Sequence, residues 1–493
     1  EEVTVSFTTE PMAGYDMARA AYILEAGVYY VRVGNSSRNT HIAGAIHLDA
    51  EAVVEQERNI CGESGFTDLK PEKCGVTYAE EAKEKVSAVS VELSAAELKR
   101  VTHVYSELPR ELPHGPACRW EEVVSGKKTM EEFVGGLTDE QLAYLCIGAY
   151  KECEDMMEVI GNASISVAGA AGETTQQLKE LGTPTLVMAD GPAGLRLSPT
   201  YECVDGTIRS TASNFGESFM MVLSEEERAA MAAAASEEAG GETYYQYCTA
   251  IPIGTGLAQS WNEELVKQCG DLVGKEMEQF GTHIWLAPAM NIFRSPLCGR
   301  NFEYYSEDPL LSGSIAAAMT LGVQAHKGCA TTIKHFACNN KETNRYFSNS
   351  RVSERALREI YLKGFEICVK HSQPHFIMTS YNLINGLHTA NSHDLIQAAA
   401  RDEWGFEGVV MTDWFTSQDV PAISGAGHIY PISASTGCVY AGNDLQMPGC
   451  QKNVDDIVEA VKTGKELDGY RLTLGDVQFC VTNLLRVVAK VMK

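Results

Sequence analysis

The sequence predicts an α/β fold: a (β/α)8-type TIM barrel over residues 126–493, with an all-β segment ahead of it. Strand-like apolar runs alternate with helical runs through this region, which is the pattern of βα units around a parallel sheet. Polar side chains directly follow several of the predicted strands, and the carboxyl ends of barrel strands are where barrel enzymes place their active sites. The same pattern therefore predicts both a fold and the position of a site.

The barrel strands are predicted as short apolar runs bounded by turn residues. Residues 164–169 are a candidate for an eighth strand, and without them the barrel is irregular. Helices lie between the strands, and the sequence TDEQ at Thr138 predicts a capping box at the start of one helix. The seven predicted strands are residues 185–189, 250–254, 284–288, 331–334, 376–380, 408–412 and 444–448.

Residues 1–55 predict β structure, with strands at 3–8 and 41–48 and two strand-like pieces within 22–33 that a turn at Ala26-Gly27 separates. So few strands cannot close a sandwich, and we therefore expect them to be part of a larger β domain. Residues 56–125 are irregular and predict a connector that wraps over the barrel. The connector includes one short helix within residues 85–104, which Ser94 would cap.

Composition limits the classes of function. The formal net charge is −26, from 66 acidic and 40 basic residues, which argues against nucleic acid and against an anionic membrane surface as partners. Fifteen scattered cysteines favour reduced thiols in a reducing compartment such as the cytoplasm. The Gly-rich turn at residues 190–196 has neither dinucleotide nor phosphate-loop spacing, and we expect no metal or cofactor.

Acids, bases and aromatic residues follow the predicted strands. A carboxylate can attack an oxocarbenium-like carbon and an indole can stack on a pyranose ring, so Asp413 and Trp414 indicate sugar chemistry. The alternative for any single acid is a helix cap, since Asp often starts the helix after a strand. Because several predicted strands place polar groups on the same face, a functional site is the favoured interpretation. The other groups at strand ends are Asp190, Lys334, His335 and Tyr381.

From about residue 128 onward, the sequence contains a dense series of motifs: ADGPAGLR at 189–196, APAMNIFRSPLCGRNFEYYSEDP at 287–309, KHFACNNKETNR at 334–345, MTSYNLING at 378–386 and GFEGVVMTDWF at 405–415. In these motifs the sequence resembles the β-glucosidase-type members of glycoside hydrolase family 3.

The resemblance implies a retaining exo-β-glycosidase in which Asp413 is the nucleophile. It points most directly to a β-glucosidase that removes terminal β-D-glucose. A β-xylosidase or another β-glycosidase is the alternative, and a non-catalytic glycan-binding subunit is the alternative from another class. Tyr381 would lie near the nucleophile and Trp414 would form an aromatic wall. The implied sugar-holding residues are Asp190, Arg196, Arg300, Lys334, His335 and Arg345.

A retaining mechanism also needs a second carboxyl group as acid and base, and no motif here supplies it. In β-glucosidase-type members this Glu comes from a separate α/β domain, and the KHFPGHG solution of other members is replaced here by KHFACNN. Residues 23–49 resemble the last strands of the family's fibronectin-type-III-like domain. The resemblance thus implies a permuted order with the barrel last. We expect an N-terminal fragment of the same polypeptide to carry the α/β domain and the acid/base Glu. A homo-oligomer is a further possible assembly.

Other residues in these motifs are expected to be structural. Arg294 and Glu303 would form an ion pair, Asp308 would cap a helix, and Trp261 would lie in the core.

Overall fold

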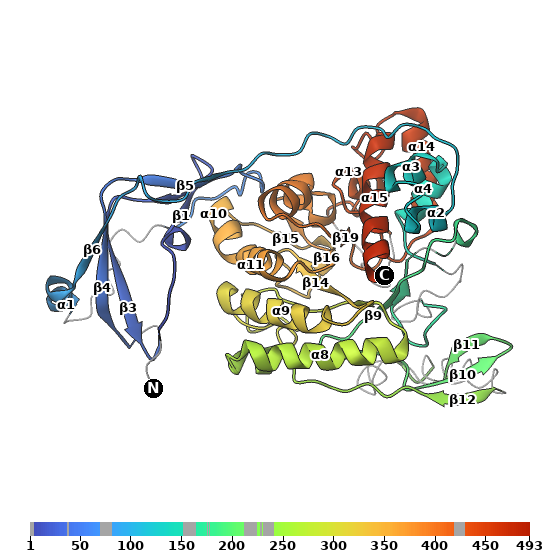
Figure 1. Cartoon of the computed structure of the whole chain (residues 1–493), viewed down its shortest axis with the longest axis horizontal. Helices are drawn as coiled ribbons and strands as arrows, with labels where there is room; N and C mark the ends of the chain where they lie inside the picture. Colours follow the sequence, from blue (N-terminus) through green and yellow to red (C-terminus); the bar gives the residue numbers. More distant parts are fainter. Residues whose placement is uncertain are drawn as a thin grey trace. The chain divides into compact units, whose positions relative to one another are not determined.

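The computed structural model describes residues 4–36, 39–69, 81–150, 164–174, 176, 178–211, 224–226, 229, 241–418 and 429–493. Contacts divide the chain into two compact units. The first unit contains Glu1–Tyr105 and Arg351–Glu359, and the second contains Ser106–Ser350 and Ile360–Lys493 (Figure 1). No helix among the described residues is long and apolar enough to cross a membrane.

The first unit contains two β-sheets that share a small core. The pairing orders are β1-β2-β5-β7 and β3-β4-β6, and residues of both sheets, such as Tyr22 and Leu48, pack in one cluster. The elements are η1 (Glu10–Met12), β1 (Gly14–Asp16), β2 (Ala21–Leu24), β3 (Gly27–Gly34), β4 (Thr40–Leu48), β5 (Ala52–Gln56), α1 (Glu81–Ser87), β6 (Ser90–Leu93), β7 (Val101–Thr102) and α10 (Glu354–Ala356).

The strands predicted at 22–33 and 41–48 are confirmed, with a break between β2 and β3. The strand predicted at 3–8 is wrong, since residues 4–8 are irregular. The helix within 85–104 is also wrong for most of its length, because residues 90–93 form β6 and pair with β4. Ser94 donates its hydroxyl to Asp49 at 2.9 Å instead of capping a helix.

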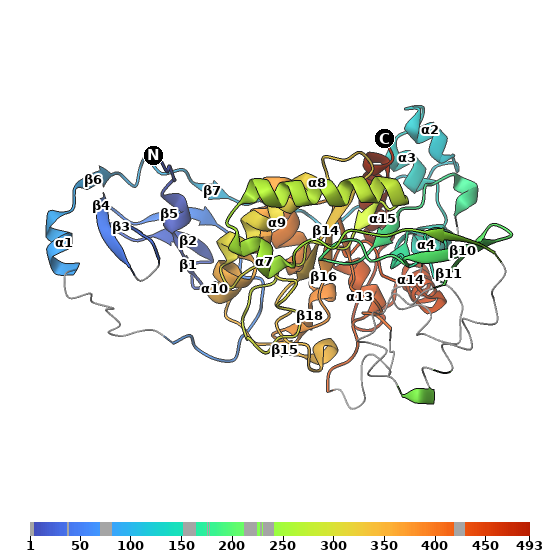
Figure 2. The same cartoon turned by 90° about the horizontal axis from the view of Figure 1, so that it is seen from below.

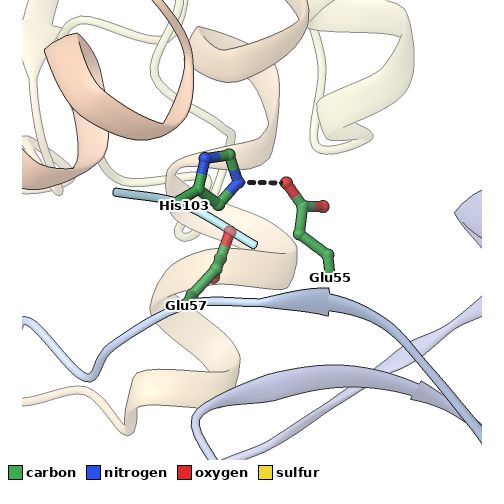
Figure 3. A group of neighbouring side chains, drawn as sticks. All are labelled: Glu55, Glu57 and His103. Carbon is green, nitrogen blue, oxygen red and sulfur yellow. Dashed lines mark hydrogen bonds and ion pairs between the residues drawn. The ribbon is translucent and has the colours of Figure 1, made fainter. Parts of the chain in front are cut away.

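Ion pairs hold the segment Arg351–Glu359 in the first unit. Buried Arg358 is ion-paired with Glu57 and donates from Nε to Glu354 at 2.8 Å. His103 Nε2 lies 2.7 Å from Glu55 Oε1, and Figure 3 shows the side chains of Glu55, Glu57 and His103 turned toward one another. All three are metal-ligand types, but His103 is already paired with Glu55, and Glu57 with Arg358.

The second unit is built on a curled sheet of order β19-β16-β14-β13-β9-β8, parallel except for β8. Single bridges extend the pairing beyond β19: Met411 pairs with Leu445, Gln446 with Ile147, and Gly148 with Thr174, next to β8. The strands are β8 (Gly172–Glu173), β9 (Val187–Ala189), β13 (Ile284–Trp285), β14 (Ala330–Phe336), β16 (Phe376–Thr379) and β19 (Val409–Met411). All their residues are buried, as expected for strands covered on both faces.

Helices cover the curled sheet, and α8 and α9 lie side by side in both views (Figure 1, Figure 2). Glycines allow this close packing, because a Cβ on Gly322 would lie 2.1 Å from the carbonyl oxygen of Lys267. The helices are α2 (Trp120–Val124), α3 (Met130–Gly135), α4 (Asp139–Leu145), η3 (Lys179–Leu181), α7 (Gly254–Gln259), α8 (Glu263–Phe280), α9 (Pro309–Val323), η4 (Arg345–Phe347), η5 (Leu357–Tyr361), α11 (Lys363–Ser372), η6 (Thr389–Asn391), η7 (Asp394–Glu403), α13 (Ser435–Tyr440), α14 (Gln451–Thr463) and α15 (Leu474–Val491).

Two small sheets lie outside the curled sheet. One has the order β11-β10-β12 and the other the order β15-β17-β18. Their strands are β10 (Thr200–Val204), β11 (Thr207–Ser210), β12 (Glu242–Tyr245), β15 (Asn349–Ser350), β17 (Leu383–Ile384) and β18 (Leu387–His388).

Five of the seven predicted strands of the second unit coincide with β9, β13, β14, β16 and β19. Residues 444–448 contribute only single bridges. The strand predicted at 250–254 is wrong, because these residues lead into α7, and 164–169 form turns. Helix capping is confirmed at Thr138 and at Asp308, which accepts from Leu310 N at 2.8 Å. Trp261 is 73% exposed, so its predicted place in the core is wrong.

Candidate active site

Four parallel strands of the curled sheet end at one edge, with β13 lying between two of them, β9 and β14. Asp190 follows β9, Lys334 and His335 lie near the end of β14, Tyr381 follows β16, and Asp413 follows β19. Because the strands pair in parallel, their carboxyl ends lie together and their side chains converge. The structure therefore brings together at one site the five residues that were predicted at strand ends.

The carboxylate of Asp413 is held by its own turn. Its side chain is largely buried, at 8% exposure for the residue, and Oδ1 accepts from the backbone N–H of Trp414 at 2.8 Å. The backbone oxygen of Asp413 accepts from Thr416 Oγ1 at 2.8 Å. Phe415, two residues on, has φ +62° and donates its N–H to Met447 O at 2.8 Å. The acid thus follows a buried strand and enters a tight, hydrogen-bonded turn.

Asp190 bridges two cations. Lys334 Nζ lies 2.8 Å from Oδ1, and Arg196 Nη2 lies 2.5 Å from Oδ2. Burial alone would raise the pKa of Asp190, but the charges of Lys334 and Arg196 outweigh it and hold this pKa below its ordinary value. Asp190 is therefore ionised at neutral pH, and the three side chains form a charged patch of hydrogen-bonding groups.

His335 is a neutral imidazole beside Asp413. Burial and the charges of Arg300, Lys334 and Arg345 lower the pKa of His335 well below its ordinary value. Arg300 Nη2 donates to Nε2 at 3.2 Å, and because an arginine can only donate, the ring proton is assigned to Nδ1, which faces Tyr304 Oη at 3.2 Å. Nε2 lies 3.8 Å from Asp413 Oδ2.

Arg300 pairs with Glu303, three residues away. Its Nε donates to Glu303 Oε1 at 2.6 Å. Burial opposes the charged form of Arg300, but Glu303 outweighs it and the pKa of Arg300 lies above its ordinary value. The ion pair predicted between Arg294 and Glu303 is wrong, because Arg294 Nε donates to Tyr361 Oη at 2.9 Å. Glu303 thus orients a predicted sugar-holding residue.

Arg345 and Trp414 complete the set. The Arg345 guanidinium lies over the Tyr381 ring, 4.5 Å from its centroid, and Nη1 contacts Glu342 at 3.3 Å. The Trp414 indole donates from Nε1 to Ala171 O at 3.1 Å, which fixes the ring against β8. Among the described residues, the carboxyl groups in contact with the predicted sugar-holding cations are Asp190, Glu303 and Glu342.

The sequence did not indicate every residue of this cluster. Asn291 exchanges two hydrogen bonds of 2.8 Å with the backbone of His335, Tyr304 contacts its ring, and Tyr346 donates to Trp414 O at 3.0 Å. Each lies inside or next to a quoted motif, and that proximity is the only signal that could have pointed to them. Their partners become visible only in the folded chain.

A family model described as the glycosyl hydrolase family 3 N terminal domain matches residues 217–472. The chain belongs to glycosyl hydrolase family 3. A curated relative, β-glucosidase A of Butyrivibrio fibrisolvens, is 35% identical over 481 residues, which are 94% of this chain and 48% of that protein. The chain spans about half the length of the curated relatives it matches over nearly its whole extent.

Solved β-glucosidase structures agree with this assignment. A β-glucosidase from Paenibacillus barengoltzii is 30% identical with a TM-score of 0.70, over 98% of this chain and 47% of that chain. β-Glucosidase 3B from Thermotoga neapolitana, in complex with α-D-glucose, is 38% identical with a TM-score of 0.57, over 74% of this chain and 43% of that chain. The curled sheet and its helices are thus the family 3 fold.

Proposed function

We propose that this chain is the nucleophile-bearing part of a retaining exo-β-glucosidase. The observation that carries the proposal is Asp413, a carboxylate at a strand end, which lies 3.8 Å from neutral His335 in a cluster whose charged donors are themselves fixed by ion pairs. Such donors match the vicinal hydroxyls of a sugar. The β-glucosidase names of the relatives support glucose as the sugar.

In this proposal, Asp413 attacks the anomeric carbon as the glycosidic C–O bond breaks, and a glycosyl ester forms. A general acid gives its proton to the departing oxygen, and water then hydrolyses the ester with retention of the β configuration. Asp190, Lys334, His335 and Arg196 hold hydroxyls of one terminal sugar, together with Arg300 and Arg345. Trp414 forms the wall on which the sugar stacks.

We propose that the curled sheet with its bridges is an irregular (β/α)8 barrel within residues 126–493. The bridges from Met411 through Gln446 to Gly148 support this, since they carry the pairing back toward β8. Residues 1–55 would be the C-terminal part of a fibronectin-III-like domain, with 56–125 as the connector. The two sheets of the first unit, which share one core, support the β-domain part.

We further propose that the acid/base Glu belongs to an N-terminal fragment of the same polypeptide. Two observations support this. The chain spans 48% of the Butyrivibrio relative, and Asp190, Glu303 and Glu342 are each ion-paired with a cation of the cluster. The pKa of Asp190 is held below its ordinary value by Lys334 and Arg196, which does not suit a general acid, and Glu303 and Glu342 are each already engaged by an arginine.

The test uses 2,4-dinitrophenyl β-glucoside, whose leaving group departs without a general acid. We expect the chain to hydrolyse it, and Asp413→Asn to lower kcat by at least about 10³-fold, because the amide cannot form the glycosyl ester. The amide oxygen can still accept from Trp414 N, so the fold is expected to be kept. Asp271→Asn, on the exposed face of α8, is the matched control.

Two further readouts separate the alternatives. Faster hydrolysis of the β-xyloside than of the β-glucoside would indicate a β-xylosidase, and glucose binding without any turnover of the activated substrate would indicate a glycan-binding subunit. Methyl β-glucoside, which needs a general acid, should be cleaved only when the N-terminal fragment is added. Equal cleavage without the fragment would contradict the proposal on the missing Glu.

A further inference from the structure

Two tyrosine hydroxyls converge on one backbone carbonyl next to Asp413. Tyr381 Oη donates to Trp414 O at 2.8 Å, and Tyr346 Oη donates to the same oxygen at 3.0 Å. The two rings are stacked, with centroids 4.0 Å apart and an interplanar angle of 24°. Both side chains are buried. A carbonyl oxygen has two lone pairs, and this arrangement can use both of them.

The carbonyl of Trp414 belongs to the peptide that enters Phe415, whose φ of +62° lies in the left-handed region. A bulky residue is rarely found there, and such a conformation persists where the surroundings hold it. On one side, Phe415 N–H donates to Met447 O at 2.8 Å. On the other side, the two phenol groups hold the preceding carbonyl. The turn that carries Asp413 is therefore restrained from both ends of one peptide.

We propose that Tyr346 is a positioning residue, which acts through the Trp414 carbonyl to keep the Asp413 carboxylate aligned for attack. Tyr381 already belongs to the predicted site, whereas Tyr346 does not. The inference rests on the proposed function of Asp413 as the nucleophile.

Tyr346 also connects this turn to Arg345. The two residues are consecutive in η4 (Arg345–Phe347), and the Arg345 guanidinium lies over the Tyr381 ring. One hydroxyl group thus joins the segment that presents a sugar-holding cation to the turn that presents the nucleophile. The alignment of attacking oxygen and bound sugar depends on both segments, so a loosened link should affect the covalent step more than sugar binding.

Both phenols stay protonated donors over the working pH range. Burial raises the pKa of Tyr381 well above its ordinary value, and the charge of Asp413 adds to this. Burial likewise raises the pKa of Tyr346. The two hydrogen bonds therefore persist from acidic to mildly alkaline pH.

The experiment measures covalent labelling with 2,4-dinitrophenyl 2-deoxy-2-fluoro-β-glucoside by intact mass, which reads the attack step without a general acid. Tyr346→Phe removes only the hydroxyl and keeps the stacked ring. We expect labelling to slow about tenfold, while the Kd for glucose changes less than about twofold. Tyr144→Phe, which removes a hydroxyl that donates to Gln451 on the surface, is the control and should label at the wild-type rate.

The outcomes are distinguishable. If the wild-type chain is not labelled, the proposed nucleophile is wrong. If the wild type is labelled and Tyr346→Phe is labelled equally fast, the positioning role is overturned. An equal loss of labelling rate and of glucose affinity would also overturn it, because that result indicates general disruption of the pocket. In the double variant with Tyr381→Phe, we expect a loss that is not the product of the single losses, since both groups bind one oxygen.

Discussion

Asp190 shows how the site is organised at the scale of single residues. It holds Lys334, which is only 3% exposed, and Arg196 before any sugar is bound. Pre-formed pairs of this kind keep donors at fixed positions, so little reorganisation is needed when hydroxyl groups bind. A carboxylate that holds two cations cannot be replaced without leaving a buried charge poorly paired.

We therefore predict that Asp190→Asn lowers kcat/KM for 2,4-dinitrophenyl β-glucoside by about 10²-fold or more, because Lys334 loses its counter-charge and the sugar loses an acceptor. Inhibition by glucose should weaken in parallel. The control is Asp271→Asn, which removes an exposed Lys–Asp pair on α8 and should leave kcat/KM unchanged. An unchanged kcat/KM in Asp190→Asn would contradict a direct role in sugar binding.

Single residues at strand ends could be predicted from the sequence, whereas their partners could not. Asp413 and Asp190 follow apolar runs, and that pattern is local. The sequence predicts an ion pair of Glu303 with Arg294, whereas the structure pairs Glu303 with Arg300, three residues away. Sequence spacing alone does not show which side chains point inward. Tyr346 is recognisable only once β16 and β19 bring Tyr381 and Trp414 to it.

At the scale of elements, strands were predicted where an apolar run is buried on both faces. The predicted strand at 250–254 fails because it contains Pro252, which has no N–H to pair, and ends where α7 begins at Gly254. The segment 164–169 alternates like a strand, but the carboxylate of buried Glu173 accepts the N–H groups of Ile165 and Ser166 at 3.0 and 2.8 Å. The Glu173 side chain thus accepts the backbone hydrogen bonds that a neighbouring strand would otherwise accept.

Asp444 joins three elements behind the site. Its Oδ2 accepts from Arg401 Nη2 of η7 at 2.6 Å and from Val410 N of β19 at 2.7 Å, and Oδ1 accepts from Asn483 Nδ2 of α15 at 2.9 Å. Asp444 is completely buried. Since β19 leads directly to Asp413, this carboxylate supports the strand that positions the acid.

We predict that Asp444→Asn lowers the free energy of unfolding by about 3–5 kcal/mol, because it leaves the charge of Arg401 unpaired and turns an amide N–H toward a donor. Urea unfolding followed by tryptophan fluorescence measures this. Asp455→Asn, exposed on α14 and bonded to Gln451, should change it by less than about 0.5 kcal/mol. Similar midpoints for the two variants would show that the Asp444 network does not stabilise the strand.

At the scale of the whole molecule, buried cysteines and several largely buried histidines are kept neutral. All thirteen described cysteines are free, and burial raises the pKa of the Cys368 thiol to about 11 and that of Cys438 to about 12. Three histidines are likewise kept neutral, because their pKa values are lowered. Burial and Lys490 lower the pKa of His375 to about 4, and burial also lowers the pKa of His283 and His388. These imidazoles take up a proton when the chain unfolds in acid.

The sign of the resulting pH dependence follows from linkage. An unfolded histidine binds its proton near pH 6.5, whereas folded His375 does so only near pH 4, so the unfolded state binds more protons between these values. Stability contributed by His375 is complete above pH 6.5 and is lost as the pH falls toward 4, by about 1.4 kcal/mol per pH unit. Acid also reduces the net charge of −26, which relieves repulsion and opposes this loss.

The relief of charge repulsion in acid is nearly the same in the wild type and in His375→Gln, so the difference between their stabilities isolates the contribution of His375. All five tryptophans lie in the second unit, so their fluorescence follows the unit that contains His375. Between pH 7.5 and 5, we predict that urea unfolding of His375→Gln loses about 2 kcal/mol less stability than the wild type, because glutamine takes up no proton. His371→Gln, at an exposed position of α11, is the control for the substitution itself. Parallel profiles for His375→Gln and the wild type would mean that His375 is protonated in the folded protein, and would place the acid sensitivity elsewhere.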